Sequence, residues 1–138
     1  MRKYFLIRYF ENRRLTIHQV NIGPTRKWGY PESNNCRPLF PNYSASIFEA
    51  IDAHAIDFAL VDVRFRIVCT LKIILECHAN NTLEIAIHDF WHRENYHLLR
   101  KYLNVVDRSC SLGVFSIKRS IDTLTAIADY ETYKFNPD

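Results

Sequence analysis

Residues 61–87 alternate between apolar and polar side chains, and this pattern constrains the fold more than any other stretch. Every odd position of 61–77 is apolar, and after a polar break at 79–82 the odd positions of 83–87 are apolar again. A period of two is typical of a strand buried on one face, whereas a helix repeats every 3.6 residues. The stretch therefore predicts a β-hairpin with its odd positions in the core. Its polar even positions are Asp62, Arg64, Arg66, Thr70, Lys72, Glu76, His78, Glu84 and His88.

The turn of this hairpin follows from the same parity. Odd positions of the two arms can share a face only across a loop of odd length. A loop of residues 79–81 meets this condition and puts Asn81, which tolerates a left-handed backbone, at the position that needs one. A loop of residues 80–82 is the alternative, but it forces the β-branched Thr82 to a positive φ. The first arm is too long for a straight strand in a domain of this size, so we expect a bend near residues 68–70.

The rest of the chain supplies further strands and helices. Segments rich in β-branched and aromatic residues, 3–11 and 15–22, predict a first hairpin, and residues 110–118 predict a further strand. Helical spacing predicts three helices: residues 47–57 after a capping box at 46–49, a segment up to residue 106 with Asp89 as its cap, and a segment from residue 121 that ends before Pro137.

These elements predict one α+β domain over residues 1–138. Their order, ββ-loop-α-ββ-α-β-α, favours a mostly antiparallel sheet of about five strands with the helices packed on one face. With 138 residues, of which 48% are hydrophobic, the chain is long enough to bury a core without disulfides or metal.

Composition and cysteine usage indicate a cytoplasmic protein without a cofactor or a metal. The net charge of +3 is too small to require a polyanionic partner. Arg8 interrupts the first apolar run, and no run approaches 18 apolar residues, so we expect no signal peptide and no membrane segment. The cysteines at 36, 69, 77 and 110 form no C-x-x-C pair, which favours reduced thiols. No P-loop, Rossmann glycine pattern, nucleophile elbow or kinase signature is present.

A long irregular loop at residues 23–46 is the main candidate for a binding surface. It contains four of the five prolines, and a loop of this length in a compact domain is usually functional or mobile. Its aromatic and basic side chains suit a protein interface or stacking on bases. The alternative is a flap whose aromatic residues fold back onto the core. The predicted partner-binding residues are Arg26, Lys27, Trp28, Tyr30, Arg37, Phe40 and Tyr43.

Histidines and cations on the predicted hairpin suggest an alternative site. His78, Glu84 and His88 would share the even face with cations, and metal-independent RNA cleavage needs such a set of base, acid and positive charge. The second predicted helix adds further cations for phosphate contacts. The alternative is a solvated polar face, which needs no ligand. The predicted nucleic-acid contacts are Arg64, Arg66, Lys72, Arg93, Arg100 and Lys101.

Two functions from different classes follow from these candidates. The absence of a catalytic motif and the aromatic-rich loop favour a non-enzymatic interaction protein of the inhibitor or immunity type, whose partner is a protein such as a toxin or an enzyme. The alternative is an RNA-binding or RNA-cleaving domain. The two differ in salt dependence, because phosphate contacts weaken steeply as salt rises.

Overall fold

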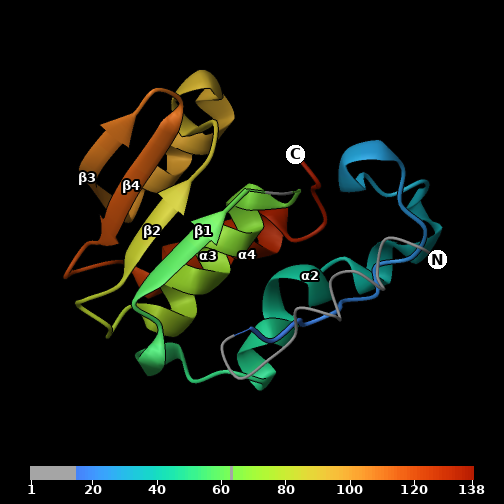
Figure 1. The fold of residues 1–138 in the computed structure, drawn as a ribbon, viewed down its shortest axis with the longest axis horizontal. Coiled ribbons are helices and arrows are strands. Elements are labelled where there is room, and N and C mark those ends of the chain that lie inside the picture. Colours follow the sequence, from blue (N-terminus) through green and yellow to red (C-terminus); the bar gives the residue numbers. More distant parts are fainter. Residues whose placement is uncertain (1–14, 63) are drawn as a thin grey trace.

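The computed structural model describes residues 15–62 and 64–138 (Figure 1). The strands are β1 (Phe58–Val61), β2 (Glu84–Ile87), β3 (Leu103–Ser109) and β4 (Leu112–Ile117). The α-helices are α2 (Asn42–Ala45), α3 (Arg66–Cys77) and α4 (Thr123–Tyr133). Short 3-10 helices are η1 (Lys27–Gly29), η2 (Asn34–Leu39), η3 (Ser46–Glu49), η4 (Ala53–Ala55), η5 (Phe90–His92) and η6 (Glu94–Lys101). No helix within the described ranges has the length and apolar character needed to cross a membrane.

The described strands form one mixed sheet in the order β1-β2-β4-β3. β1 and β2 are parallel, whereas β4 is antiparallel to both of its neighbours. The fold is α+β as predicted, and its four strands are close to the predicted number of about five. Figure 1 shows α3 behind β1, and α3 in turn packs on α4.

The predicted hairpin at residues 61–87 is wrong in its first arm, because residues 66–77 form the helix α3. The alternation is imperfect there: Val68 and Ile74 are apolar at even positions, and both are buried. Ile67, Leu71 and Ile74 also follow the i, i+4, i+7 spacing of a helical face. Since β1 and β2 are parallel, the chain must cross back along the sheet between them, and a helix is the usual way to do so.

Other element predictions need smaller corrections. Residues 46–49 form a single 3-10 turn without a side-chain cap, in place of the start of a longer helix. Asp89 directly precedes the 3-10 helix η5 with a left-handed backbone, but its side chain makes no capping hydrogen bond, and residues 104–106 belong to β3. Residues 16–22 form no strand, and residues 3–11 lie outside the described part of the chain. The last helix is present, although its cap is Asp122, which accepts hydrogen bonds from the amides of Leu124 and Thr125.

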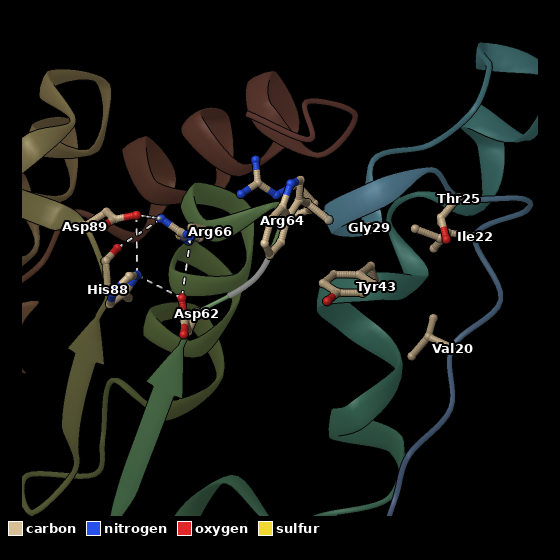
Figure 2. A pocket seen from close by; sticks show the side chains of 11 residues that line it. Val20, Ile22, Thr25, Gly29, Tyr43, Asp62, Arg64, Arg66, His88 and Asp89 are labelled. Atoms are coloured by element: carbon tan, nitrogen blue, oxygen red, sulfur yellow. Dashed lines mark hydrogen bonds and ion pairs between the residues drawn. The ribbon is translucent and has the colours of Figure 1, made fainter. Parts of the chain in front are cut away.

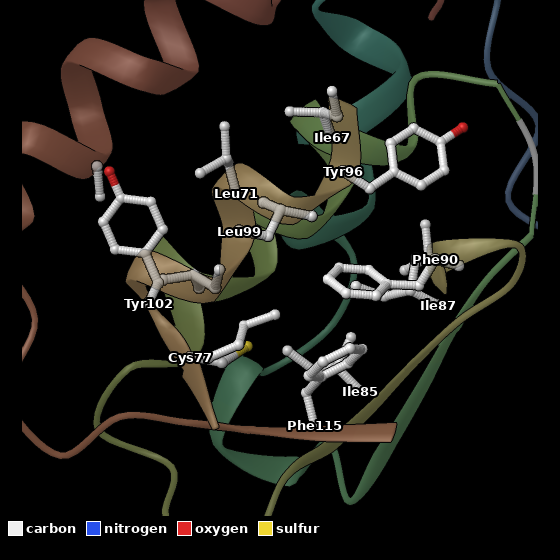
Figure 3. Close-up of a cluster of buried hydrophobic side chains, with 14 of the residues drawn as sticks. Ile67, Leu71, Cys77, Ile85, Ile87, Phe90, Tyr96, Leu99, Tyr102 and Phe115 are labelled. Atoms are coloured by element: carbon white, nitrogen blue, oxygen red, sulfur yellow. The ribbon is translucent and has the colours of Figure 1, made fainter. Parts of the chain in front are cut away.

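The main hydrophobic core lies between the sheet and the helices on its inner face (Figure 3). Ile85 of β2 pairs with Ala59 of β1 on one side and with Phe115 of β4 on the other, so these positions share a face. The side chains labelled in Figure 3 come from α3, β2, β4 and the segment 90–102, and they are Ile67, Leu71, Cys77, Ile85, Ile87, Phe90, Tyr96, Leu99, Tyr102 and Phe115.

A second, smaller core joins the segment 20–43 to the start of α3. Phe40 is 1% exposed and its ring meets that of Phe65 edge to face, with centroids 5.5 Å apart. Phe65 precedes α3 with a left-handed φ of 60°, a conformation that costs a bulky residue energy and persists only where packing fixes it. This packing holds the segment 20–43 against the end of β1.

Candidate functional site

A pocket of about 700 Å³ lies where the parallel strands β1 and β2 end (Figure 2). Polar side chains line its sheet side, because residues 62–66 follow β1 and residues 88–89 follow β2 directly. The segment 20–43 closes the opposite side. We call this cavity the strand-end pocket, and its lining residues are Val20, Ile22, Thr25, Trp28, Gly29, Tyr43, Asp62, Arg64, Arg66, His88 and Asp89.

Arg66 organises the polar side of the strand-end pocket. It is 4% exposed, and its guanidinium lies 3.6 Å from Asp62 and 3.3 Å from Asp89. The same group donates hydrogen bonds to the His88 carbonyl at 3.1 Å and to the Tyr96 hydroxyl at 3.4 Å. A buried cation needs paired charges and hydrogen bonds of this kind. Arg66 therefore ties the ends of both parallel strands to the first turn of α3.

His88 stands between the two carboxylates of this group. Its Nδ1 atom lies 3.0 Å from Asp62 Oδ1 and 3.4 Å from Asp89 Oδ2. Burial by itself would raise the pKa of Asp89, but His88 and Arg66 outweigh burial and hold that pKa below its usual value. An imidazole that carboxylates orient in a pocket can take up or release a proton of a bound molecule. We call Asp62, Arg66, His88 and Asp89 the strand-end cluster.

Tyr96 and Asp138 complete the back of the cluster. The Tyr96 hydroxyl donates to Asp138 Oδ2 at 3.0 Å, and the backbone amide of Arg66 donates to the same oxygen at 3.4 Å. Burial, together with the charge of Asp138, raises the pKa of Tyr96 to about 12, so its hydroxyl keeps its proton as a donor.

Arg64 is the second buried cation of the pocket, and its contacts differ from those of Arg66. It is 9% exposed and donates one hydrogen bond, at 2.5 Å, to the Tyr30 hydroxyl. The guanidinium carbon also lies 4.4 Å from the centre of the Tyr30 ring. In the described part of the chain, its buried Nε atom has no hydrogen-bond partner and no carboxylate forms an ion pair with the guanidinium.

The predicted partner-binding loop divides into exposed and buried residues. Arg26, Lys27 and Trp28 are exposed, and Trp28 retains 75% of its accessible surface. Phe40 is buried in the second core, and the Tyr43 ring lies 5.3 Å from that of Phe65. The buried part of the loop therefore agrees with the alternative of a flap whose aromatic residues fold back onto the core. Residues 26–28 remain accessible to a partner. The other two predicted residues are Tyr30, under Arg64, and Arg37, over the ring of Phe135.

The structure does not bring the alternative catalytic residues together. His78 is exposed at the end of α3, so it does not share a strand face with His88. Glu84 begins β2, whereas His88 follows its other end. RNA cleavage by these three residues stays a prediction, and the structure shows no site that the three of them share.

The predicted nucleic-acid contacts are also distributed over several surfaces. Arg64 and Arg66 line the strand-end pocket, and Lys72 on α3 forms an ion pair with Glu76. Lys101 forms an ion pair with Asp129 of α4. Arg93 and Arg100 belong to the region of η6, where Arg100 is exposed. RNA binding stays a prediction, and these cations form no single described patch on which it could rest.

Sequence reasoning named three residues on the polar side of the pocket, but for another reason; it named Trp28 and Tyr43, on the opposite side, as partner-binding residues. Arg64, Arg66 and His88 were predicted as one polar sheet face, whereas Asp62 and Asp89 were not singled out as a site. The position of these five residues in the sequence could have identified them as a site. Polar residues that directly follow apolar strands meet at the carboxyl edge of a parallel sheet. No group of three or more His, Cys, Asp or Glu residues in ranges 15–62 and 64–138 is arranged to hold a metal ion.

Comparisons with known proteins inform the fold. No family model matches the sequence, and no curated protein matches it. The structure is similar to the crystal structure of a methyltransferase-like protein from Silicibacter pomeroyi DSS-3, with a TM-score of 0.69 and 23% sequence identity. The matched region covers 84% of this chain and 59% of that protein. At this identity the likeness concerns the fold alone.

Proposed function

We propose that this protein binds a small polar molecule in the strand-end pocket. The observation that carries the proposal is the convergence of Asp62, Arg64, Arg66, His88 and Asp89 on one cavity of about 700 Å³. Small-molecule sites in proteins have this size and combine an apolar wall with a few convergent polar groups. Here Val20, Ile22 and Tyr43 belong to the other wall.

The place of the pocket in the fold supports the same proposal. In open sheets with parallel strands, ligands bind in the crevice outside the carboxyl ends of the strands. Asp62 and His88 occupy equivalent places there, since Val61 and Ile87 are paired residues at the ends of β1 and β2. A hydroxyl or amine of a ligand next to His88 would have a group that can exchange a proton with it.

The name of the similar structure suggests methyl transfer as a function to consider, and this reaction requires a methyl donor. Open sheets commonly hold a nucleotide-type cofactor at a glycine-rich turn between a strand and a helix. The turn from β1 into α3, residues 62–66, contains no glycine, and its two arginines are both buried. These residues do not fit such a donor, and the proposal for this chain is restricted to binding a small molecule.

Ligand-induced stabilisation would test the proposal. Thermal unfolding should be measured with a panel of neutral and charged metabolites for the parent, His88→Gln and His54→Gln. A ligand at ten times its Kd stabilises the folded state by about 1.4 kcal/mol, which raises Tm by a few degrees. We expect His88→Gln to weaken this shift.

His54→Gln is the matched control, because His54 is exposed on η4 and does not line the pocket. It should keep the full shift. A shift that is the same in all three proteins would place the ligand elsewhere, and a panel without any stabilising ligand would count against the proposal.

A second function, protein binding of the inhibitor or immunity type, is favoured by the exposure of Trp28. This side chain is 75% exposed, and the Lys27 ammonium lies 5.2 Å from the centre of its ring. Tryptophan and arginine are the residues that most often dominate the binding energy of an interface, and Arg26 is exposed nearby. Under this proposal the partner is a protein such as a toxin, and the protein acts in the cytoplasm.

A further inference from the structure

We propose that Arg64 holds an oxyanion of the pocket's ligand, either a carboxylate or a phosphate. This inference rests on the proposed small-molecule function and adds the chemical class of the ligand. It follows from the contrast between two neighbouring arginines that are buried to a similar degree. Arg66 is 4% exposed and Arg64 is 9% exposed, but only Arg66 has carboxylates within ion-pair distance among the described residues.

Two of the nearby acids, Asp62 and Asp89, are already engaged. Asp62 and Asp89 both lie against Arg66 and His88. Asp138 lies near enough for Arg64 to lower its pKa, although burial raises that pKa overall. The Asp138 Oδ2 atom accepts hydrogen bonds from Tyr96 and from the Arg66 amide. The buried Oδ1 atom has no hydrogen-bond partner among the described residues, and it lies beyond ion-pair distance of Arg64. None of these carboxylates forms an ion pair with the Arg64 guanidinium.

Unused donors remain on Arg64. A guanidinium carries five N–H donors in a planar fork, and an uncompensated buried charge is costly. Within the described chain, this group donates one hydrogen bond, from Nη1 to the Tyr30 hydroxyl. The buried Nε atom has no hydrogen-bond partner among residues 15–62 and 64–138. A carboxylate or a phosphate accepts two parallel hydrogen bonds from such a fork.

Tyr30 fixes the direction of the guanidinium. The ring lies 4.4 Å from the guanidinium carbon, and the hydroxyl accepts from Nη1, so two contacts with one side chain hold the group. In the view of Figure 2, Arg64 stands between the strand-end cluster and the loop residues Gly29 and Tyr43. An anion on Arg64 would therefore leave the rest of the ligand within the pocket that His88 also lines.

Anion titration followed by NMR tests this inference. Inorganic phosphate and acetate should each be added to ¹⁵N-labelled protein, up to about 20 mM, at constant ionic strength. We expect a saturable shift of the Arg64 Nε–Hε resonance with at least one of the two anions. Arg64→Gln should weaken that anion's affinity at least about tenfold. The anion that binds more tightly identifies the source of the oxyanion, and either preference supports the inference.

Arg37→Gln is the control, since Arg37 is exposed and rests on the ring of Phe135 outside the pocket. It should bind the anion as the parent does. If Arg64→Gln fails to fold, the shift of the Arg64 Nε–Hε resonance in the parent protein tests the inference. An unshifted Arg64 resonance with both anions, or equal affinity in folded Arg64→Gln, would overturn the inference. Stabilisation by neutral metabolites would still leave the proposed function standing, so the two failures are distinguishable.

Discussion

At the scale of single residues, the loop 23–46 shows what composition can and cannot predict. Trp28, Phe40 and Tyr43 are all aromatic residues of one proline-rich segment, yet Phe40 is 1% exposed and Trp28 is 75% exposed. The composition of the loop predicted a functional segment, but it did not separate the buried aromatic residues from the exposed one. The separation depends on Phe65, whose ring packs against both Phe40 and Tyr43 and which lies 22 or more residues away in the chain.

Removal of the Trp28 side chain should barely affect stability. Trp28→Ala combined with Arg26→Ala should keep Tm within a few degrees of the parent, because both side chains are exposed. If the protein-binding proposal holds, the same double variant should weaken the natural partner by at least about 2 kcal/mol. Thermal unfolding and calorimetric titration would measure the two effects.

Phe40→Ala provides the contrast within the same loop. It removes a buried ring and should lower the free energy of unfolding by about 3–5 kcal/mol. A strong loss of stability in the Trp28 and Arg26 double variant, similar to that of Phe40→Ala, would contradict the exposed position of Trp28.

The candidate site was predictable only in part for a related reason. Arg64, Arg66 and His88 drew attention because they are charged or titratable residues within an apolar stretch. Asp62 and Asp89 become part of a site only through the parallel pairing of β1 and β2, which puts both strand ends at one edge. Antiparallel pairing of β1 with β2 would have put the carboxyl ends of these strands at opposite edges of the sheet and so separated the two residues.

At the scale of elements, α3 shows how a short apolar segment can fit two periods. Odd positions of 66–77 are apolar, but so are the even positions Val68 and Ile74, and short apolar runs are ambiguous between strand and helix. The elements with stronger local signals were predicted better. β4 lies within the predicted strand at 110–118, and α4 lies within the predicted C-terminal helix.

Two adjacent isoleucines distinguish the helix from the predicted strand. Ile74 is 0% exposed and Ile73 is half-buried, whereas a strand with odd positions in the core would reverse this order. Ile74→Ala should therefore lower the free energy of unfolding by about 2–5 kcal/mol, and Ile73→Ala should lower it by clearly less. Denaturant unfolding of the two variants measures the difference. A larger loss of stability for Ile73→Ala than for Ile74→Ala would instead support the strand that the sequence predicted.

At the scale of the whole molecule, the fold joins a parallel pair of strands to an antiparallel hairpin. The number and mixture of elements were enough to predict an α+β fold. The sheet order β1-β2-β4-β3 was not predicted, because it depends on which strands meet after α3 has crossed between β1 and β2. Periodicity along the chain contains no direct information about that pairing.

Arg66 links four parts of the molecule, so its removal should weaken the whole fold. It belongs to α3 and contacts residues after β1, after β2 and in η6, namely Asp62, Asp89 and Tyr96. Arg66→Met keeps much of the side-chain volume but leaves these groups without their donor. Hydrogen bonds to charged groups contribute about 1.5–3 kcal/mol each, so we expect a loss of roughly 2–4 kcal/mol in stability.

Arg100→Met is the matched control, because Arg100 is exposed near the end of η6. It should change the free energy of unfolding by no more than about 0.5 kcal/mol. Chemical denaturation of the two variants measures both values, and similar losses in the two would show that Arg66 has no special role in joining the elements.

The arrangement of the sheet also affects the order in which its parts can assemble. Only Cys110 and Ser111 separate β3 from β4, whereas residues 62–83 separate β1 from β2. Closing a short loop costs less chain entropy, so we expect the β3–β4 hairpin to form early and the β1–β2 pair late. The strand-end pocket needs the β1–β2 pair and also the segment 20–43, so it is complete only when all of these parts have assembled. A molecule that fits this pocket would therefore bind only the fully assembled chain, and its binding would favour that state over the partly folded ones.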